Sequence, residues 1–393
     1  MNKLKILCIM LAAIMCTFAF SCGGGQQPSG DTTSELPDTA DSGNGQTEQL
    51  PELTDEEIRD RDDEAFLAGI SFPRYALGEE GKAFFSGRWY EKEIDGVNHM
   101  VTTTDGAQLF LLTEGTEKLV LSFTSIDRRG TPYIAVSVDG SDPERVLITE
   151  AEIELPDKER HAVRIFADGL HEMESKWIEE IGFALRSIDV DEGGRFRGIV
   201  PQNKLVFFYG DSITEGIAIL GNGKSSDFNS ATAAFPYQCC QELGAIPYYI
   251  GYSASGLLSH GYFRSMKIAM EKLSLKRDID YSLIPDLIVI NHGCNDGGTP
   301  SEEFCTAMEE TLTRLIEMYP GVPIAYMIPI KGALADEIIK TAEKFDIVSV
   351  IETKDWELTT FTDGVHPDVE CSKKIGSYLA EALRNLYGSD FFE

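Results

Sequence analysis

Basic residues are scarce in this 393-residue sequence, in which 34 Lys and Arg stand against 65 Asp and Glu and leave a net charge of −31. A surface of that sign repels a phosphate backbone, so the balance excludes nucleic acid as a partner. The acidic residues are spread along the chain, and we interpret the charge as a contribution to solubility. With 42% apolar and 25% charged residues, the chain is otherwise typical of a globular protein.

Cysteine is also sparse and irregularly spaced. Two of the eight lie in the first apolar segment and one follows it, which leaves Cys239, Cys240, Cys294, Cys305 and Cys371. Their number is odd and no CxxC spacing occurs, so we expect buried free thiols instead of a disulfide framework. The chain has no GxGxxG motif, no P-loop and no histidines at metal-ligand spacing, so neither a metal nor an organic cofactor is predicted.

The long apolar run of the sequence lies at the N-terminus, where Ile6 to Phe20 follow two lysines. Residues 1–21 are therefore predicted to be a signal peptide. Ala19-Phe20-Ser21-Cys22 resembles a bacterial lipobox, in which the Cys22 thiol is acylated and becomes the mature N-terminus. This interpretation predicts a protein lipid-anchored in the bacterial cell envelope, on the periplasmic or outer surface. The alternative is an ordinary secretory signal in which Cys22 is incidental.

Three further segments follow. Residues 22–53 are rich in Gly, Ser, Thr, Asp and Pro and predict a flexible linker. Thr54 and Glu57 form a capping-box pattern that opens a short helix. From about Phe84 to Ile188 the apolar residues then alternate, as in 119–123 and 134–138, with Asp-Gly turn signals between the runs. Residues 54–195 are therefore predicted to form a short helix and an antiparallel β-sandwich.

Residues 196–393 show a different pattern. Short apolar runs at 205–209, 247–250, 287–290, 324–327 and 347–350 alternate with helical periods. Strands that are buried on both faces and alternate with helices indicate a parallel α/β sheet.

Chemistry-bearing residues follow the strands of this sheet. Ser212 comes directly after the first strand, where the N-terminus of a helix favours a developing anion. Asp363 and His366, three residues apart on a tight loop, can supply a base and the carboxylate that orients it. Without Ser212, His366 would be interpreted as a loop histidine satisfied by Asp363.

Two more residues are predicted at the same sheet edge. Asn295 follows the strand at 287–290, and Gly256 follows the strand at 247–250. Acyl transfer needs fixed donors at the carbonyl oxygen, and the Ser212 N–H, the Gly256 N–H and the Asn295 amide can supply them.

The motifs GDSIT, a later Gly, GxND and DxxHP, in this order, resemble the four blocks of the GDSL or SGNH hydrolase superfamily over about residues 205–387. The resemblance implies a flavodoxin-like three-layer α/β fold for residues 196–393. It also implies that Ser212 is the nucleophile, His366 the base and Asp363 its orienter, with Gly256 and Asn295 in the oxyanion hole.

The order of the predicted β-sandwich and the predicted α/β domain along the chain indicates a particular family within this superfamily. A sandwich ahead of such a domain, with the Phe85–Trp89 and His161–Arg164 motifs, is similar to the second carbohydrate esterase family, which removes acetyl groups from sugar hydroxyls. It implies a jelly-roll-like accessory domain. Trp356, ten residues before His366, is predicted either to stack on a sugar ring or to pack the loop at the rim of the cleft.

We therefore expect a lipid-anchored serine esterase that removes small acyl groups, acetyl foremost, from carbohydrate through an acyl-enzyme. Its partners would be an acylated glycan or other small ester and the membrane. One alternative is an SGNH lipase or arylesterase that acts on longer acyl chains. The other is a non-catalytic glycan-binding lipoprotein.

Overall fold

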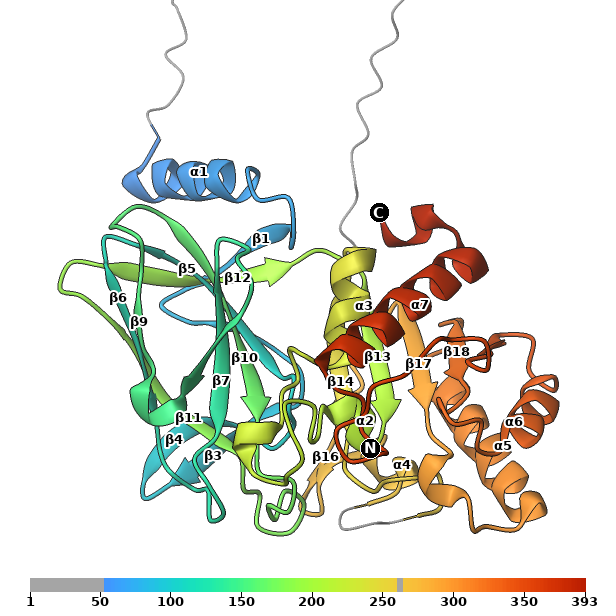
Figure 1. Ribbon diagram of the computed structural model, residues 1–393. Coiled ribbons are helices and arrows are strands. Elements are labelled where there is room, and N and C mark those ends of the chain that lie inside the picture. Colours follow the sequence, from blue (N-terminus) through green and yellow to red (C-terminus); the bar gives the residue numbers. More distant parts are fainter. Residues whose placement is uncertain (1–52, 260–263) are drawn as a thin grey trace, which may run out of the picture. The chain divides into compact units, whose positions relative to one another are not determined.

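The computed structural model describes residues 53–259 and 264–393 (Figure 1). The predicted signal peptide, the linker up to residue 52 and the acylation candidate Cys22 lie outside the described residues. Helix α1 (Asp55–Leu67) begins with the predicted capping box. The Thr54 hydroxyl accepts from the Glu57 N–H at 3.2 Å, and the Glu57 carboxylate accepts from the Thr54 N–H at 2.7 Å.

Two antiparallel sheets follow, in the order β1-β12-β5-β10-β7-β8, with β2 beside β5, and β3-β4-β11-β6-β9. The first comprises β1 (Tyr75–Glu80), β2 (Phe84–Ser86), β5 (Gln108–Glu114), β7 (Tyr133–Val138), β8 (Glu144–Leu147), β10 (His161–Gly169) and β12 (Arg195–Pro201). The second comprises β3 (Trp89–Ile94), β4 (Val97–Thr102), β6 (Lys118–Phe123), β9 (Glu152–Glu154) and β11 (Phe183–Val190).

The alternating residues of the two sheets share one core. Leu109 and Leu111 of β5 pack in the same buried cluster as Leu119 and Leu121 of β6, and Phe183 of β11 joins them. Because successive side chains of a strand point to opposite faces, the period of two places these residues between the sheets. The antiparallel strands predicted from the alternation are confirmed.

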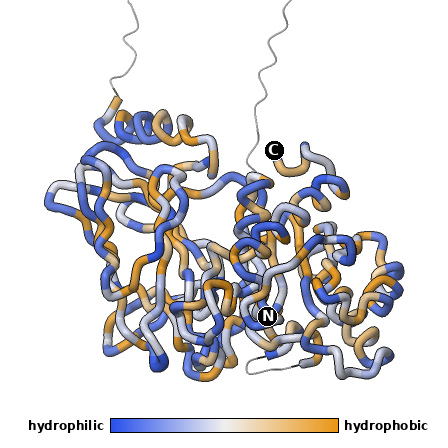
Figure 2. The backbone as a smooth tube through the Cα atoms, in the orientation of Figure 1, coloured by the Kyte–Doolittle hydropathy of each residue, from blue (hydrophilic) through white to orange (hydrophobic). Residues whose placement is uncertain are grey.

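Helix α1 covers the outer face of the first sheet, although most of its residues are hydrophilic (Figure 2). Its last residue, Leu67, packs against this face, and the buried Asp63 accepts from Arg160 and Arg195 at 2.7 Å each. Burial raises the pKa of Asp63, but the bonds from Arg195 and Arg160 outweigh this effect and hold the pKa below its ordinary value. An ionised Asp63 therefore fastens α1 to the sheet.

The remaining large sheet is parallel, in the order β14-β13-β17-β18-β19. Its strands are β13 (Leu205–Gly210), β14 (Ile246–Gly251), β17 (Leu287–Asn291), β18 (Ile324–Met327) and β19 (Val348–Ile351). Numbered along the chain, this order is 2-1-3-4-5, that of the flavodoxin-like doubly wound folds. The five apolar runs recognised in the sequence are these five strands.

Helices cover both faces of this sheet. They are α2 (Ser212–Glu215), α3 (Phe235–Leu243), α4 (Met266–Ala269), α5 (Ser301–Met318), α6 (Ala335–Ala342) and α7 (Val369–Tyr387). Val206 and Phe208 of β13 pack with α3 and α7, which lie side by side in Figure 1. Phe207 and Tyr209 point to the other face and pack with α4, α5 and α6. The strand order reverses at β13, and functional groups of such sheets gather at the carboxyl ends of the strands beside that point.

Short elements complete the fold. They are the hairpin β15 (Lys272–Ser274) and β16 (Arg277–Asp278) and the 3₁₀ turns Ile148–Glu150, Ser226–Phe228, Cys294–Asp296 and Ser389–Phe392. Within residues 53–259 and 264–393, no helix combines the length and the apolar character needed to cross a bilayer.

The five cysteines of the described residues are unpaired. Cys239, Cys240 and Cys371 are buried, as expected. Cys294 and Cys305 are partly exposed, so the expectation of burial was wrong for these two.

Candidate active site

Ser212, His366 and Asp363 form a continuous chain of hydrogen bonds. Ser212 is the first residue of α2, directly after β13, and the other two lie in the loop before α7. Ser212 Oγ lies 2.9 Å from His366 Nε2, and His366 Nδ1 lies 2.7 Å from Asp363 Oδ2. Nucleophile, base and orienting carboxylate need this relation, so the structure brings the three predicted side chains together.

The loop that carries His366 is closed by its own backbone. The Thr362 N–H donates to the His366 carbonyl at 2.9 Å, and Gly364 takes the positive φ of 84° that the tight turn requires. Asp363 Oδ1 accepts the N–H groups of Val365 at 2.9 Å and His366 at 2.8 Å. The same carboxylate therefore fixes the turn and the imidazole ring.

The charge of Asp363 persists over a wide pH range. Burial raises its pKa, but the N–H and ring bonds from His366 outweigh this effect and lower the pKa to about 2. A depressed carboxyl pKa stabilises the fold at pH values above the unfolded pKa, and that contribution is lost as the pH falls through about 2. Asp363 is thus ionised at pH values above about 2.

Asn295 lies beside this chain, in the 3₁₀ turn after β17. Its amide nitrogen donates to Asp211 Oδ2 at 3.1 Å and to the Ser255 carbonyl at 2.9 Å. Asn295 therefore joins the residue before Ser212 to the loop after β14. Both of its amide hydrogens have acceptors in this arrangement.

Gly256 has a different environment from the one predicted for an oxyanion donor. Its N–H donates to the Ser259 carbonyl at 3.0 Å, so it is turned into its own loop. A Cβ on Gly256 would lie 2.4 Å from both carboxylate oxygens of Asp296, which itself accepts the N–H of Leu257 at 2.8 Å. The Asp296 carboxylate therefore leaves no room for a side chain at residue 256, which explains why this residue is glycine.

Two carboxylates of this site, Asp211 and Asp296, were not predicted from the sequence. Asp211 caps α2 by accepting the Ile213 N–H at 3.0 Å, and its burial raises its pKa to about 6. Asp296 holds the loop after β14 through the N–H groups of residues 257–259. Asp211 belongs to the GDSIT motif and Asp296 to the GxND motif. Their place in these two motifs is the sequence feature that could have identified them as site residues.

Trp356 is partly buried and stacks on Tyr378 of α7, with ring centroids 5.4 Å apart and planes 21° apart. One face of the indole is therefore covered by the protein. Both roles considered for Trp356, stacking on a sugar ring and packing the loop at the rim of the cleft, stay predictions.

A buried charged cluster lies under α2. The Lys176 ammonium lies 3.2 Å from Asp105 Oδ2 and also donates to Glu215, the last residue of α2. All three side chains are at most 1% exposed. They come from the turn before β5, the segment between β10 and β11, and α2, three residues from Ser212. Lys176 therefore ties the turn that carries Ser212 to the antiparallel sheets.

This cluster is costly to bury and sensitive to the loss of one member. Burial raises the pKa of Glu215 and that of Asp105 above their ordinary values, and the Lys176 ammonium offsets this effect only in part. Removing one partner of a buried ion pair leaves the other charge buried without a partner.

Among residues 53–259 and 264–393, no group of three or more His, Cys, Asp or Glu side chains is arranged to hold a metal ion.

The antiparallel sandwich and the parallel sheet of order 2-1-3-4-5, with the Ser212 site at its carboxyl edge, give a fold similar to that of solved carbohydrate esterases of family two. No family model matches this chain, and neither does any curated protein. The fold does match solved structures.

One is a family two carbohydrate esterase from Clostridium thermocellum in complex with cellohexaose, 18% identical, with a TM-score of 0.63 over 78% of this chain and 100% of that chain. Another is an acetyl xylan esterase from the rumen bacterium Butyrivibrio proteoclasticus, 17% identical, with a TM-score of 0.64 over 79% of this chain and 97% of that chain. A third is a salicylyl-acyltransferase from a tetracycline biosynthetic pathway, 15% identical, with a TM-score of 0.58 over 80% and 98%.

We predict that Lys176→Met lowers both stability and kcat. The substitution leaves two buried carboxyl groups without their ammonium partner, at a cost of about 3–5 kcal/mol. Urea denaturation and kcat for a small ester measure the two effects. Lys267→Met, which removes an exposed lysine paired with Glu310, is the matched control and should change neither.

Replacing all three side chains, Lys176→Met with Asp105→Leu and Glu215→Met, removes the stranded charges and should recover stability relative to Lys176→Met. If Lys176→Met alone is as stable and as active as wild type, the cluster does not fasten the Ser212 turn.

Proposed function

We propose that this protein is a serine esterase that removes small acyl groups, acetyl foremost, from carbohydrate through an acyl-enzyme. The observation that carries the proposal is the hydrogen-bond chain from Ser212 through His366 to Asp363 at the carboxyl end of β13. The similarity in fold to a family two carbohydrate esterase and an acetyl xylan esterase supports the choice of substrate class.

The proposed reaction has two halves. Ser212 Oγ attacks the ester carbonyl carbon while His366 Nε2 takes its proton, and the carbonyl oxygen becomes an oxyanion. The tetrahedral intermediate collapses, the bond to the sugar oxygen breaks, and His366 gives that oxygen the proton. Water then attacks the acyl carbon while His366 Nε2 takes its proton. The bond from that carbon to Ser212 Oγ breaks, His366 returns the proton to Oγ, and the carboxylic acid leaves. Asp363 orients His366 and stabilises its protonated form.

The oxyanion requires donors that act only once it forms. Ser212 is the first residue of α2, and its N–H has no acceptor within the helix. We propose Asn295 as the second donor. Its bond to Asp211, 3.1 Å long, is the longer of its two and is the one that an oxyanion would replace. Gly256 becomes a third donor only if its N–H leaves the Ser259 carbonyl.

The sequence also supports a proposal about the domain roles and the cellular location of the protein. We propose that residues 54–195 act as an accessory domain, that residues 196–393 are catalytic, and that Cys22 carries a lipid that holds the protein in the cell envelope. The membrane is then a partner through the lipid alone.

We predict that Ser212→Ala and His366→Ala each abolish most turnover, on the order of 10⁴-fold or more in kcat. Asp363→Asn should be roughly 10²-fold milder, because Asp363 acts through His366. Acetate release from acetylated glycans measures the effects. Ser225→Ala and His171→Ala are the controls, because they replace the same residue types outside the chain of hydrogen bonds. Both should keep the wild-type kcat.

Substrate choice separates the alternatives. Short p-nitrophenyl esters should turn over faster than octanoyl esters, and the reverse order would favour the lipase or arylesterase. Binding of glycan without any turnover would favour the non-catalytic protein. Efficient transfer of the acyl group to an added alcohol instead of water would indicate an acyltransferase. A fully active Ser212→Ala enzyme would refute the mechanism.

A further prediction concerns Asn295. A group that acts on the transition state alone changes kcat and leaves KM nearly constant. We expect Asn295→Ala to lower kcat by about 10²–10³ while it still forms a covalent phosphonate at Ser212. Because Asn295 also joins Asp211 to the Ser255 loop, melting temperature is measured on the same preparation. Lost stability with a normal kcat, or a higher KM at constant kcat, would contradict the oxyanion role.

A further inference from the structure

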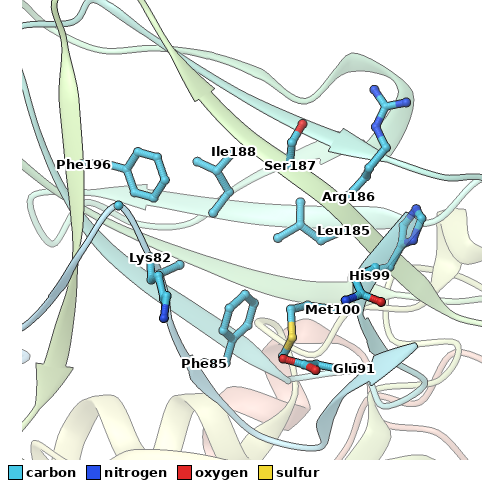
Figure 3. Close-up of a pocket in the computed structure, with 13 residues that line it drawn as sticks. Lys82, Phe85, Glu91, His99, Met100, Leu185, Arg186, Ser187, Ile188 and Phe196 are labelled. Atoms are coloured by element: carbon cyan, nitrogen blue, oxygen red, sulfur yellow. The ribbon is translucent and has the colours of Figure 1, made fainter. Parts of the chain in front are cut away.

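A cavity of about 500 Å³ opens between the two antiparallel sheets (Figure 3). Phe85 of β2 and Phe196 of β12 line it from the first sheet, and Met100 of β4 and Leu185 of β11 line it from the second. None of its lining residues belongs to the Ser212 site. Its volume lies within the ~300–1,000 Å³ of small-molecule sites.

The cavity exists because two strands diverge. β4 and β11 pair over three positions and stop at Met100↔Leu185. The register of β11 against β6 shifts at this point, between Leu185 and Ser187, which marks a β-bulge. β11 then continues to Val190 paired with β6, while β4 continues with β3. The edge of β11 beyond Leu185 therefore faces the cavity instead of β4.

The floor of the cavity is the sandwich core itself. Phe85, Phe196, Met100 and Ile188 are partly buried and pack against the cluster between the sheets, and Leu185 belongs to that cluster. The rings of Phe85 and Phe196 lie at the cavity wall in Figure 3. An apolar ligand face would therefore meet aromatic and aliphatic carbon here.

The rim is polar and carries charges of both signs. Glu91 of β3 and Arg186 of β11 are exposed, and no ion pair or hydrogen bond joins either side chain to another residue of the described part of the chain. Asn98 adds an exposed amide, whereas Lys82 pairs with Glu79 at 2.7 Å. Glu91 can only accept hydrogen bonds and Arg186 can only donate them.

We propose that this cavity is a second binding site, for an uncharged stretch of glycan. A pyranose ring has an apolar C–H face for Phe85 and Phe196, and its hydroxyl groups donate to Glu91 and accept from Arg186. An acyl chain would use only the floor. An acidic polymer would meet Glu91 and the net charge of −31. The proposal rests on the proposed function, because the glycan held here would be the polymer that the Ser212 site deacylates.

Two contacts with one polymer have a kinetic consequence. Once the cavity holds a chain, its acyl groups reach Ser212 at an effective concentration set by the chain between the two contacts. The cavity therefore lowers KM for a polymeric substrate and leaves kcat unchanged. A small ester cannot span both sites, so its hydrolysis does not depend on the cavity.

The test uses a pair of double variants with the same change in charge. Glu91→Ala with Arg186→Ala removes the rim, and Glu159→Ala with Arg59→Ala removes one exposed acid and one exposed base elsewhere. Both are made in the full chain that carries Ser212→Ala, which prevents turnover. Calorimetric titration with cellohexaose and with xylohexaose measures binding. We expect the rim variant to bind at least one of them about tenfold or more weakly than the control.

Equal glycan affinity in the two variants would overturn the proposal. A second result would also overturn it: the control binds dodecanoate but neither oligosaccharide, and the rim variant no longer binds dodecanoate. The cavity would then be a site for acyl chains. A third variant, Phe196→Leu, keeps the apolar floor but removes the ring. Weaker glycan binding with an unchanged melting temperature supports ring stacking.

Kinetics of the same double variants with Ser212 intact separate this proposal from the proposed function. On an acetylated polymer, the rim variant should raise KM several-fold at constant kcat, and both variants should hydrolyse p-nitrophenyl acetate at the wild-type rate. An unchanged KM for the polymer contradicts a role of the cavity in catalysis. If wild type hydrolyses no ester at all, the proposed function fails, and the titration alone decides whether the cavity binds glycan.

Discussion

The hydrogen bond between Ser212 Oγ and His366 Nε2 joins residues 154 positions apart, and the account of the site depends on it. It exists only if the turn after β13 and the loop before α7 are both held to within tenths of an ångström. On the His366 side, Asp363 supplies that precision by accepting two backbone N–H groups and one ring nitrogen. Asp363, which is bonded to the ring of His366, thus also shapes the loop.

The turn that carries Ser212 is held by contacts from more distant segments of the chain. Helix α2 is a single turn, so it is held by its neighbours more than by its own hydrogen bonds. Asp211 caps its start and contacts Asn295, while Glu215 at its end contacts Lys176, which also binds Asp105 before β5. The antiparallel sheets thereby contribute directly to the position of Ser212. Buried charges stabilise a fold less than apolar packing does, and this cluster lies beneath Ser212.

Local patterns predicted much of this molecule. The five apolar runs became β13, β14, β17, β18 and β19, the capping box opened α1, and the motif order identified the residues that meet at the sheet edge. Each of these features depends on residues a few positions apart, which a sequence displays directly.

Other features depend on contacts that a sequence does not display. Lys176, Asp105 and Glu215 come from three distant segments, and charged residues are rarely expected in a core. The Gly256 N–H was predicted from the order of motifs, but its direction is decided by the Ser259 carbonyl and the Asp296 carboxylate. The cavity between the antiparallel sheets arises from a register shift in β11, which alternation alone does not reveal.

The most direct test of the account is to trap the acyl-enzyme. The protein is mixed with p-nitrophenyl acetate, quenched in acid within the first turnover, digested, and examined by mass spectrometry. The account predicts one acetyl group on the peptide that contains Ser212, and none on that peptide in the Ser212→Ala protein. Rapid ester hydrolysis with no acetyl group on Ser212 at any quench time, or with the label on another residue, would contradict the central claim that Ser212 is the nucleophile.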